Sequence, residues 1–202
     1  MLVVFIGTMI VSFSRYSIER ILGTDDLGIY ATATAPAMIV QIAVAMIFAP
    51  LINLFADSLK NKRKDRFITI FFLAFGGTIL FTFILAAGSH FYGEWGLNIL
   101  YNDEIITTSA YLLTEAVFVA GLTASLWLLN YAFSATRDLK GILIGNIIGM
   151  IACLAGTDYF LIRLGLAGAN YIMIISQGIA VTFLVLRLFW FIRKKRELFK
   201  PE

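Results

Sequence analysis

Six apolar stretches, separated by short links, run through the whole length of this chain. They cover residues 1–14, 27–55, 67–88, 109–134, 141–162 and 170–192. A helix needs about 20 apolar residues to cross the hydrocarbon core of a membrane, and every stretch except the first reaches that length. The chain is 60% hydrophobic and only 14% charged, which leaves too little polar surface for a water-soluble fold. The sequence therefore predicts an all-α integral membrane protein.

The first stretch can span a membrane only if its helix continues through the polar residues that follow. We expect one helix over residues 1–22, with Arg15, Glu19 and Arg20 on its last turns. Arg15 and Glu19 are four residues apart, so they share one face of that helix. With this extension the chain has six transmembrane helices.

The six predicted helices form one lobe over residues 1–192, and a basic tail follows at 193–202. Basic residues are distributed unequally between the two sides of this lobe. The tail and the connections on its side hold 12 Lys and Arg residues, against 3 in the connections on the other side. The positive-inside rule then places both termini in the cytoplasm. We interpret the densest run, Lys60–Arg66, as a topology anchor attracted to anionic lipid. Arg187, near the tail, is expected to snorkel to the lipid headgroups.

Three arginines lie on the outer side, where the charge rule disfavours them: Arg15, Arg20 and Arg163. Positive charge on that side indicates an anionic partner, and a guanidinium fork is well suited to phosphate or pyrophosphate. Arg163 has an ordinary explanation, an ion pair with Asp158 at the membrane interface. Arg15 and Arg20 are therefore the candidate anion-binding residues.

Few polar residues lie within the apolar stretches. Glu115 is seven positions into the fourth stretch, where an ionised carboxylate costs up to about 3 kcal/mol. It could relay a proton, bind a cation such as sodium, or pair with Arg15, and a glutamate without a role is the alternative. Gln41 and Gln177 are further candidates for a polar cavity between the helices.

Two prolines indicate that the second stretch, 27–55, is not a straight helix. At 1.5 Å per residue a straight helix of that length would extend about 43 Å, more than a perpendicular span requires. Pro36 lies within the stretch and Pro50 near its cytoplasmic end, and each removes a backbone hydrogen bond. They are candidate hinges of a moving helix, with a static kink as the alternative.

No sequence motif typical of an enzyme is present, whether a zinc-protease helix, a nucleophile elbow or a phosphate-binding loop. The single cysteine, Cys153, excludes an intrachain disulfide. The basic residues lie beside apolar stretches, so membrane lipid and not nucleic acid is the expected partner. We expect neither enzymatic activity nor a bound cofactor, apart from proton or sodium coupling at Glu115.

Several short motifs resemble one family of membrane transporters. The first is Arg15-Tyr16-x-Ile18-Glu19-x-x-Leu22-Gly23-x-x-x-Leu27-Gly28-x-Tyr30, followed by Pro50-Leu51. The others are Ile99–Glu104, in which the family often has glycine at the position of Asn102, Arg137–Lys140 and Leu164–Ala169. Together they resemble the Wzx-type polysaccharide and O-antigen flippases of the multidrug/oligosaccharidyl-lipid/polysaccharide superfamily, which includes MATE-like exporters.

The resemblance implies one half, the C-terminal one, of a transporter with twelve helices in two six-helix lobes around a central cavity. Such flippases move lipid-linked oligosaccharides across bacterial inner membranes by alternating access, and undecaprenyl-pyrophosphate-linked glycans are the implied substrates. Arg15, Arg20 and Glu19 would bind the substrate, and Glu115 would be the coupling residue. The implied partners are the glycan lipid, membrane lipids and an N-terminal six-helix lobe or another copy of the chain.

Two other functions stay open from the sequence. A cation-coupled multidrug exporter of the same superfamily would be expected to hold more acidic residues inside the lobe, where only Glu115 lies deep. A non-transporting membrane scaffold, or a truncated product without activity, is the alternative from another class.

Overall fold

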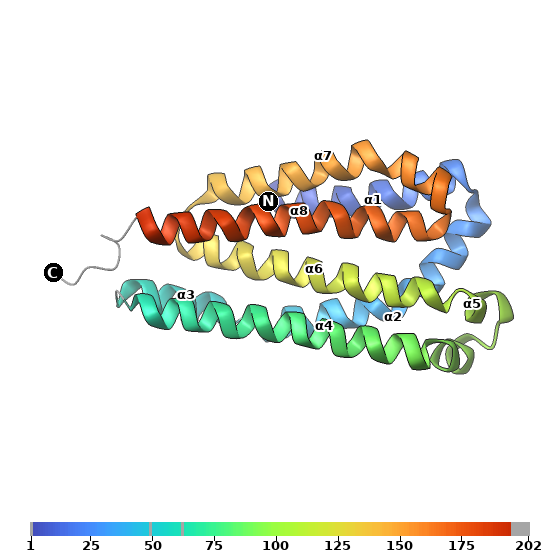
Figure 1. The fold of residues 1–202 in the computed structure, drawn as a ribbon, viewed down its shortest axis with the longest axis horizontal. Helices are drawn as coiled ribbons and strands as arrows, with labels where there is room; N and C mark the ends of the chain where they lie inside the picture. Colours follow the sequence, from blue (N-terminus) through green and yellow to red (C-terminus); the bar gives the residue numbers. More distant parts are fainter. Residues whose placement is uncertain (1, 49, 62, 195–202) are drawn as a thin grey trace.

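The fold is described from a computed structural model that covers residues 2–48, 50–61 and 63–194, so the predicted basic tail lies outside it from residue 195 onward. All regular structure in the described residues is helical. The helices are α1 (Leu2–Ile21), α2 (Thr24–Phe48), α3 (Leu51–Lys60), α4 (Lys64–Tyr101), α5 (Glu104–Thr108), α6 (Ala110–Ala135), α7 (Leu139–Leu164) and α8 (Leu166–Lys194). The long helices run roughly along one axis in an elongated bundle (Figure 1).

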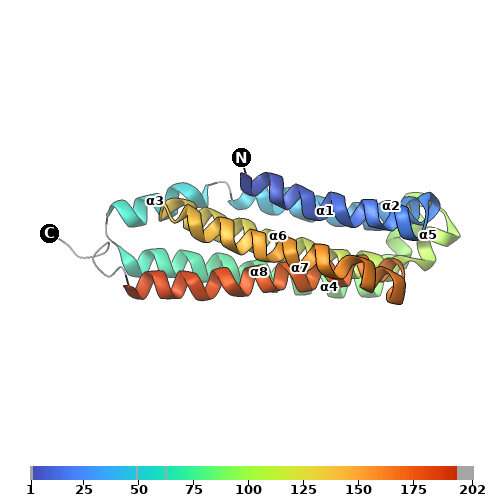
Figure 2. The same cartoon turned by 90° about the horizontal axis from the view of Figure 1, so that it is seen from above.

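The bundle is organised around α6, which packs on α2, α4 and α8, while α7 packs on α8 and α1. Seen from above, α1 and α2 form one layer, and α4 and α8 form the opposite one (Figure 2). Most positions of α6 are buried, and Ala, Gly and Leu account for most of these. Small residues let helix backbones approach closely, which matters where lipid provides no hydrophobic drive for association.

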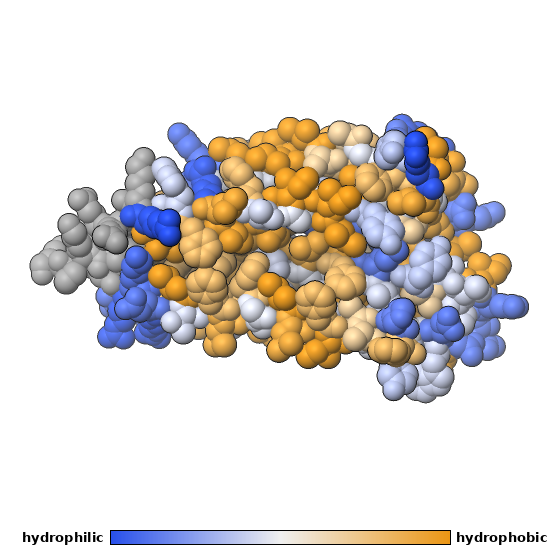
Figure 3. Space-filling model, viewed as in Figure 1, coloured by the Kyte–Doolittle hydropathy of each residue, from blue (hydrophilic) through white to orange (hydrophobic). Residues whose placement is uncertain are grey.

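Five helical stretches among the described residues are long and apolar enough to cross a membrane. They are Thr24–Lys60, Lys64–Tyr101, Ala110–Ala135, Leu139–Leu164 and Leu166–Arg193. Figure 3 shows the corresponding surface, a broad apolar belt between two hydrophilic ends. An apolar surface of this extent is suited to hydrocarbon and not to water. The chain is therefore a multi-pass membrane protein, as its composition predicts. α1 is not among these five stretches, so the sixth transmembrane helix stays a prediction.

The two ends of the bundle differ in charge. The end that carries the α3–α4 and α6–α7 turns holds Lys60, Arg63, Arg137 and Lys140, and we refer to it as the basic end. The opposite end carries the α1–α2 and α7–α8 turns together with α5 (Figure 1), and we refer to it as the acidic end. Its acidic residues are Glu19, Asp25, Asp26, Glu94, Asp103, Glu104 and Asp158.

Four of the six predicted helices correspond to α1, α6, α7 and α8 within a few residues, and the stretch expected over 27–55 is covered by α2 and α3, which together form one candidate span. α2 ends at Phe48, and α3 begins at Leu51 directly after Pro50. Proline lacks a backbone N–H, so it suits the start of a helix and interrupts a continuous one. Pro36 instead lies inside α2. Figure 1 shows α2 changing direction between its first turns, which cross the acidic end, and its later turns.

α4 extends well beyond the predicted range 67–88, and most of the connection expected over 89–108 is helical. The glycines in this region resemble loop residues, but Gly93 is buried against α6. A Cβ at Gly93 would be in ordinary van der Waals contact with the Cβ of Ala110, at 3.7 Å, so this part of α4 packs on the start of α6. α4 ends where Asn102 adopts a left-handed φ of 48°, a common way to terminate a helix.

An ion pair fixes the α6–α7 turn to α8 at the basic end. Arg187 on α8 donates from Nε to Asp138 Oδ2 at 2.9 Å, and from a terminal nitrogen to Oδ1 at 3.1 Å. Asp138 also accepts from the backbone N–H of Gly141 in the first turn of α7. Arg187, which was expected to snorkel to lipid headgroups, is thus held by a carboxylate of the protein itself.

Replacing Arg187 with methionine is expected to lower the free energy of unfolding by about 2 kcal/mol, because the partly buried Asp138 carboxylate then loses its two hydrogen bonds from the guanidinium. The double variant Arg187→Met/Asp138→Asn removes that charge and should recover part of the loss. Thermal unfolding in a mild detergent measures both effects. If the double variant is as unstable as the sum of the two single variants, the pair does not act as a unit.

Candidate functional site

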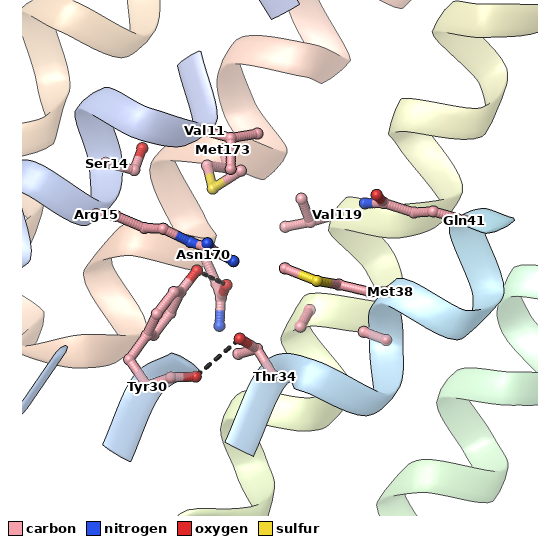
Figure 4. A pocket seen from close by; sticks show the side chains of 12 residues that line it. Val11, Ser14, Arg15, Tyr30, Thr34, Met38, Gln41, Val119, Asn170 and Met173 are labelled. Carbon is pink, nitrogen blue, oxygen red and sulfur yellow. Dashed lines mark hydrogen bonds between the residues drawn. The ribbon is translucent and has the colours of Figure 1, made fainter. Parts of the chain in front are cut away.

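A small cavity of about 70 Å³ lies between α1, α2, α6 and α8, nearer the acidic end than the basic end. The side chains that line it are Val11, Ser14, Arg15, Tyr30, Thr34, Ala37, Met38, Gln41, Ala116, Val119, Asn170 and Met173 (Figure 4). Apolar groups make up much of the wall, and a few polar groups converge within it. The lining resembles that of a ligand-binding site, although such sites commonly have volumes of several hundred Å³.

α2 contributes five of the lining side chains, on both sides of Pro36. Proline leaves the carbonyl four residues earlier without its usual helical partner and bends the helix. Thr34 donates from its hydroxyl to the Tyr30 carbonyl at 2.7 Å in this bent region. Of the two predicted hinges, Pro36 is therefore at the cavity, whereas Pro50 begins α3 near the basic end.

Arg15 projects from α1 into the cavity (Figure 4). Its side chain is partly buried, and within the described part of the chain it forms no hydrogen bond or ion pair. A guanidinium carries five N–H donors and no acceptor. Leaving these donors unmatched between membrane helices is costly, so Arg15 is suited to hold an anionic group that enters the cavity.

The other residues of the predicted anion site lie away from the cavity. Arg20 forms a salt bridge with Asp158 of α7, with the same terminal nitrogen 2.5 Å from each carboxylate oxygen. Glu19 is exposed and does not line the cavity. The ion pair expected between Asp158 and Arg163 is wrong, because Arg163 instead lies over the ring of Tyr159, 5.1 Å from its centroid.

A chain of hydrogen bonds leads from the cavity wall to the acidic residue of α6. The Tyr30 hydroxyl donates to Asn170 Oδ1 at 2.8 Å, and Asn170 Nδ2 lies 3.2 Å from Glu115 Oε2 and 3.3 Å from the Leu112 carbonyl. Asn170 is only 1% exposed and connects three helices. Sequence reasoning missed it because it is the first residue of the apolar stretch 170–192, where it resembles a flanking residue. α8 begins four residues earlier, so Asn170 lies one turn inside the helix.

The three predicted polar candidates occupy different positions. Glu115 lies next to the cavity and reaches it through this hydrogen-bonded chain, and no ion pair with Arg15 forms among the described residues. Gln41 lines the cavity wall. Gln177 does not line the cavity. Its Oε1 accepts a hydrogen bond from the Thr123 hydroxyl at 3.0 Å, which connects α8 to α6.

The charges around the cavity are one guanidinium and, one hydrogen bond beyond the wall, one carboxylate. Such an arrangement can hold an anion at Arg15 and a proton or a monovalent cation at Glu115. In the described ranges no group of three or more His, Cys, Asp or Glu residues could hold a metal ion.

No protein-family model matches this chain, and neither does any curated protein or solved structure. A function is therefore inferred from the fold, the cavity and the short sequence motifs.

Proposed function

We propose that this chain is one six-helix lobe of a transporter that moves lipid-linked glycans across the bacterial inner membrane by alternating access. The proposed substrate is a glycan linked to undecaprenyl pyrophosphate. The observation that carries the proposal is the Arg15 guanidinium, which enters a cavity formed by α1, α2, α6 and α8 and has no hydrogen-bond or ion-pair partner among the described residues.

The chemistry of Arg15 supports an anionic substrate. An arginine kept within a membrane bundle normally pairs with an acid or marks a substrate path. Arg20 forms a salt bridge with Asp158, whereas Arg15 forms no ion pair with any described residue. A guanidinium fork matches the oxygens of a phosphate or pyrophosphate, which can accept two parallel hydrogen bonds.

The size of the cavity and the bend of α2 support a binding mode that requires movement. A cavity of about 70 Å³ has room for a few water molecules but not for a glycan headgroup. Bending of α2 at Pro36 would widen it, since α2 forms much of the wall. A second lobe, or another copy of the chain, would complete the path, as in other transporters with repeated halves. By the charge rule the basic end faces the cytoplasm, which places Arg15 in the outer half.

A cation-coupled multidrug exporter is the second candidate, and Glu115 is the observation that favours it. Its carboxylate accepts a hydrogen bond from Asn170 next to the cavity. A proton or sodium ion bound at this position could favour one conformation of the cavity over another. Under the flippase proposal the same residue supplies the coupling. Only the glycan-lipid proposal requires an anionic ligand at Arg15.

Arg15→Ala is expected to weaken binding of farnesyl pyrophosphate, a soluble stand-in for the substrate, by about tenfold or more. A charge-assisted hydrogen bond contributes about 1.5–3 kcal/mol, and 1.4 kcal/mol corresponds to a factor of ten. Isothermal titration of the purified chain in detergent measures the affinity, with farnesol as the uncharged reference ligand. Arg15→Lys should retain part of the affinity, because lysine keeps the charge but not the fork.

Arg163→Ala is the matched control, because Arg163 is an exposed arginine at the same end of the bundle and does not line the cavity. It should bind farnesyl pyrophosphate like the unmodified chain. Equal affinity in the Arg15→Ala variant, or equal binding of farnesol and farnesyl pyrophosphate, would exclude Arg15 as the anion site.

A further inference from the structure

A second hollow, larger and almost wholly apolar, lies on the outside of the bundle between α4 and the α2–α3 pair. It has a volume of about 380 Å³ and is lined by Val44, Ile47, Phe48, Leu51, Leu54, Ile70, Leu73, Ala74, Gly77, Thr78 and Phe81. The one hydroxyl in this set, on Thr78, donates to the Ala74 carbonyl of its own helix. A cavity of about 150 Å³ can hold benzene, so this groove has room for a segment of hydrocarbon chain.

The groove is open to the side, and two of its three helices, α3 and α4, are fixed to each other. Ile47 on α2 is 65% exposed and Leu73 on α4 is 77% exposed, so both rims face the surrounding hydrocarbon. Phe55 of α3 and Phe67 of α4 are fully buried against each other, with ring centroids 5.1 Å apart. This contact holds α3 on α4, and a preformed groove binds its occupant at a lower entropic cost.

Positive charge gathers where the two walls of the groove meet. We refer to the basic residues of the α3–α4 turn as the basic turn: Lys60, Arg63 and Lys64. None of them forms a hydrogen bond or ion pair through its side chain with any described residue. Two acids lie nearby, Asp57, which is paired with Arg66 at 3.0 Å, and the exposed Asp65. The basic turn therefore keeps a net positive charge.

The spacing between the groove and the basic turn fits a lipid. Leu54 is the last lining residue of α3, and Lys60 follows it by six residues, or about 9 Å along a helix. Ile70 is the first lining residue of α4, and Lys64 precedes it by the same interval. A phosphate at the turn would thus have its hydrocarbon chain directed along the groove. Basic residues at a membrane surface attract anionic lipid by about 1 kcal/mol each.

We propose that this groove is a specific site for one anionic phospholipid, with an acyl chain between α2 and α4 and its phosphate at the basic turn. The site is separate from the Arg15 cavity and requires no transport activity.

Native mass spectrometry of the full chain in detergent tests the proposal with added phosphatidylglycerol and phosphatidylcholine of identical acyl chains. We expect one bound phosphatidylglycerol, with an affinity about tenfold above that of phosphatidylcholine. Gly77→Phe should abolish this preference by filling the groove. A Cβ at Gly77 meets nothing within 4 Å, so the substitution places its ring in open groove space without a clash at the backbone.

Gly76→Phe is the matched control, because Gly76 is the adjacent exposed glycine and does not line the groove. A Cβ at Gly76, like one at Gly77, meets no atom within 4 Å.

Lys60→Gln/Lys64→Gln should weaken phosphatidylglycerol binding about tenfold, whereas Arg137→Gln/Lys140→Gln, at the other turn of the same end, should not. Equal binding of both lipids, or equal behaviour of the two phenylalanine variants, overturns the proposal. Displacement of phosphatidylglycerol by an equal concentration of farnesyl pyrophosphate also overturns it, since the groove would then belong to the transported lipid. Arg15→Ala should leave phosphatidylglycerol binding unchanged.

Discussion

Replacing Gly168 with alanine is expected to destabilise the protein by about 3 kcal/mol or more, at the upper end of what overpacking costs. Gly168 lies in the first turn of α8, where it crosses the end of α7. A Cβ there would lie 2.2 Å from the carbonyl oxygen of Phe160 and 2.5 Å from its carbonyl carbon. Because these atoms belong to the backbone, no rotation of a side chain relieves the clash, and α8 must move away from α7.

Gly178→Ala, in the same helix, is the control for the Gly168 variant. A Cβ at Gly178 meets nothing within 4 Å, and alanine is the better helix former by up to about 1 kcal/mol. Thermal unfolding in detergent should show a midpoint lowered by about 6 °C or more for Gly168→Ala, and an unchanged or higher midpoint for Gly178→Ala. Equal midpoints in the two variants would contradict the close crossing of α7 and α8.

Asn170→Leu is expected to lower the free energy of unfolding by about 2 kcal/mol. Leucine has the same number of side-chain heavy atoms and the same branching at Cγ, but it leaves the Tyr30 hydroxyl without its acceptor and the Glu115 carboxylate without its amide donor. An unsatisfied buried polar group costs about 1–3 kcal/mol. Polar contacts between membrane helices are often worth less, about 0.6 kcal/mol on average. Because Asn170 is 1% exposed and its replacement interrupts two contacts, we expect a cost of about 2 kcal/mol and not 0.6 kcal/mol.

A double-mutant cycle assigns this cost to the Tyr30 contact. In a Tyr30→Phe background the hydroxyl is absent, so Asn170→Leu should cost less, by about 0.5–2 kcal/mol. Asn98→Leu, at an exposed position near the end of α4, should leave the thermal midpoint unchanged. If Asn170→Leu costs the same with and without the Tyr30 hydroxyl, the hydrogen bond between α2 and α8 contributes nothing to stability.

The helices themselves were predictable to different degrees. The ranges expected for α6 and α7 agree with the structure within two residues at each end, because continuous apolar composition marks a span directly. α4 was predicted too short, because the apolar stretch ends at residue 88 whereas the helix continues through the polar and aromatic residues that follow. In the fold Gly93 is a packing position against α6. α2 and α3 lie on either side of Pro50, the residue at which the sequence already predicts a hinge or a kink.

Composition and spacing along the chain are enough to give the membrane class of the protein, the number of long apolar stretches and the uneven distribution of basic residues among the connections. These features are local properties of the chain. Which arginine at the acidic end is available for a ligand depends on the fold. Arg20 is paired with Asp158, which is 138 residues away, whereas Arg15 faces a cavity formed by four helices. Asn170 likewise gained its role from Tyr30 and Glu115 on two other helices. The partners of a polar side chain between membrane helices come from remote segments, so local sequence does not specify them.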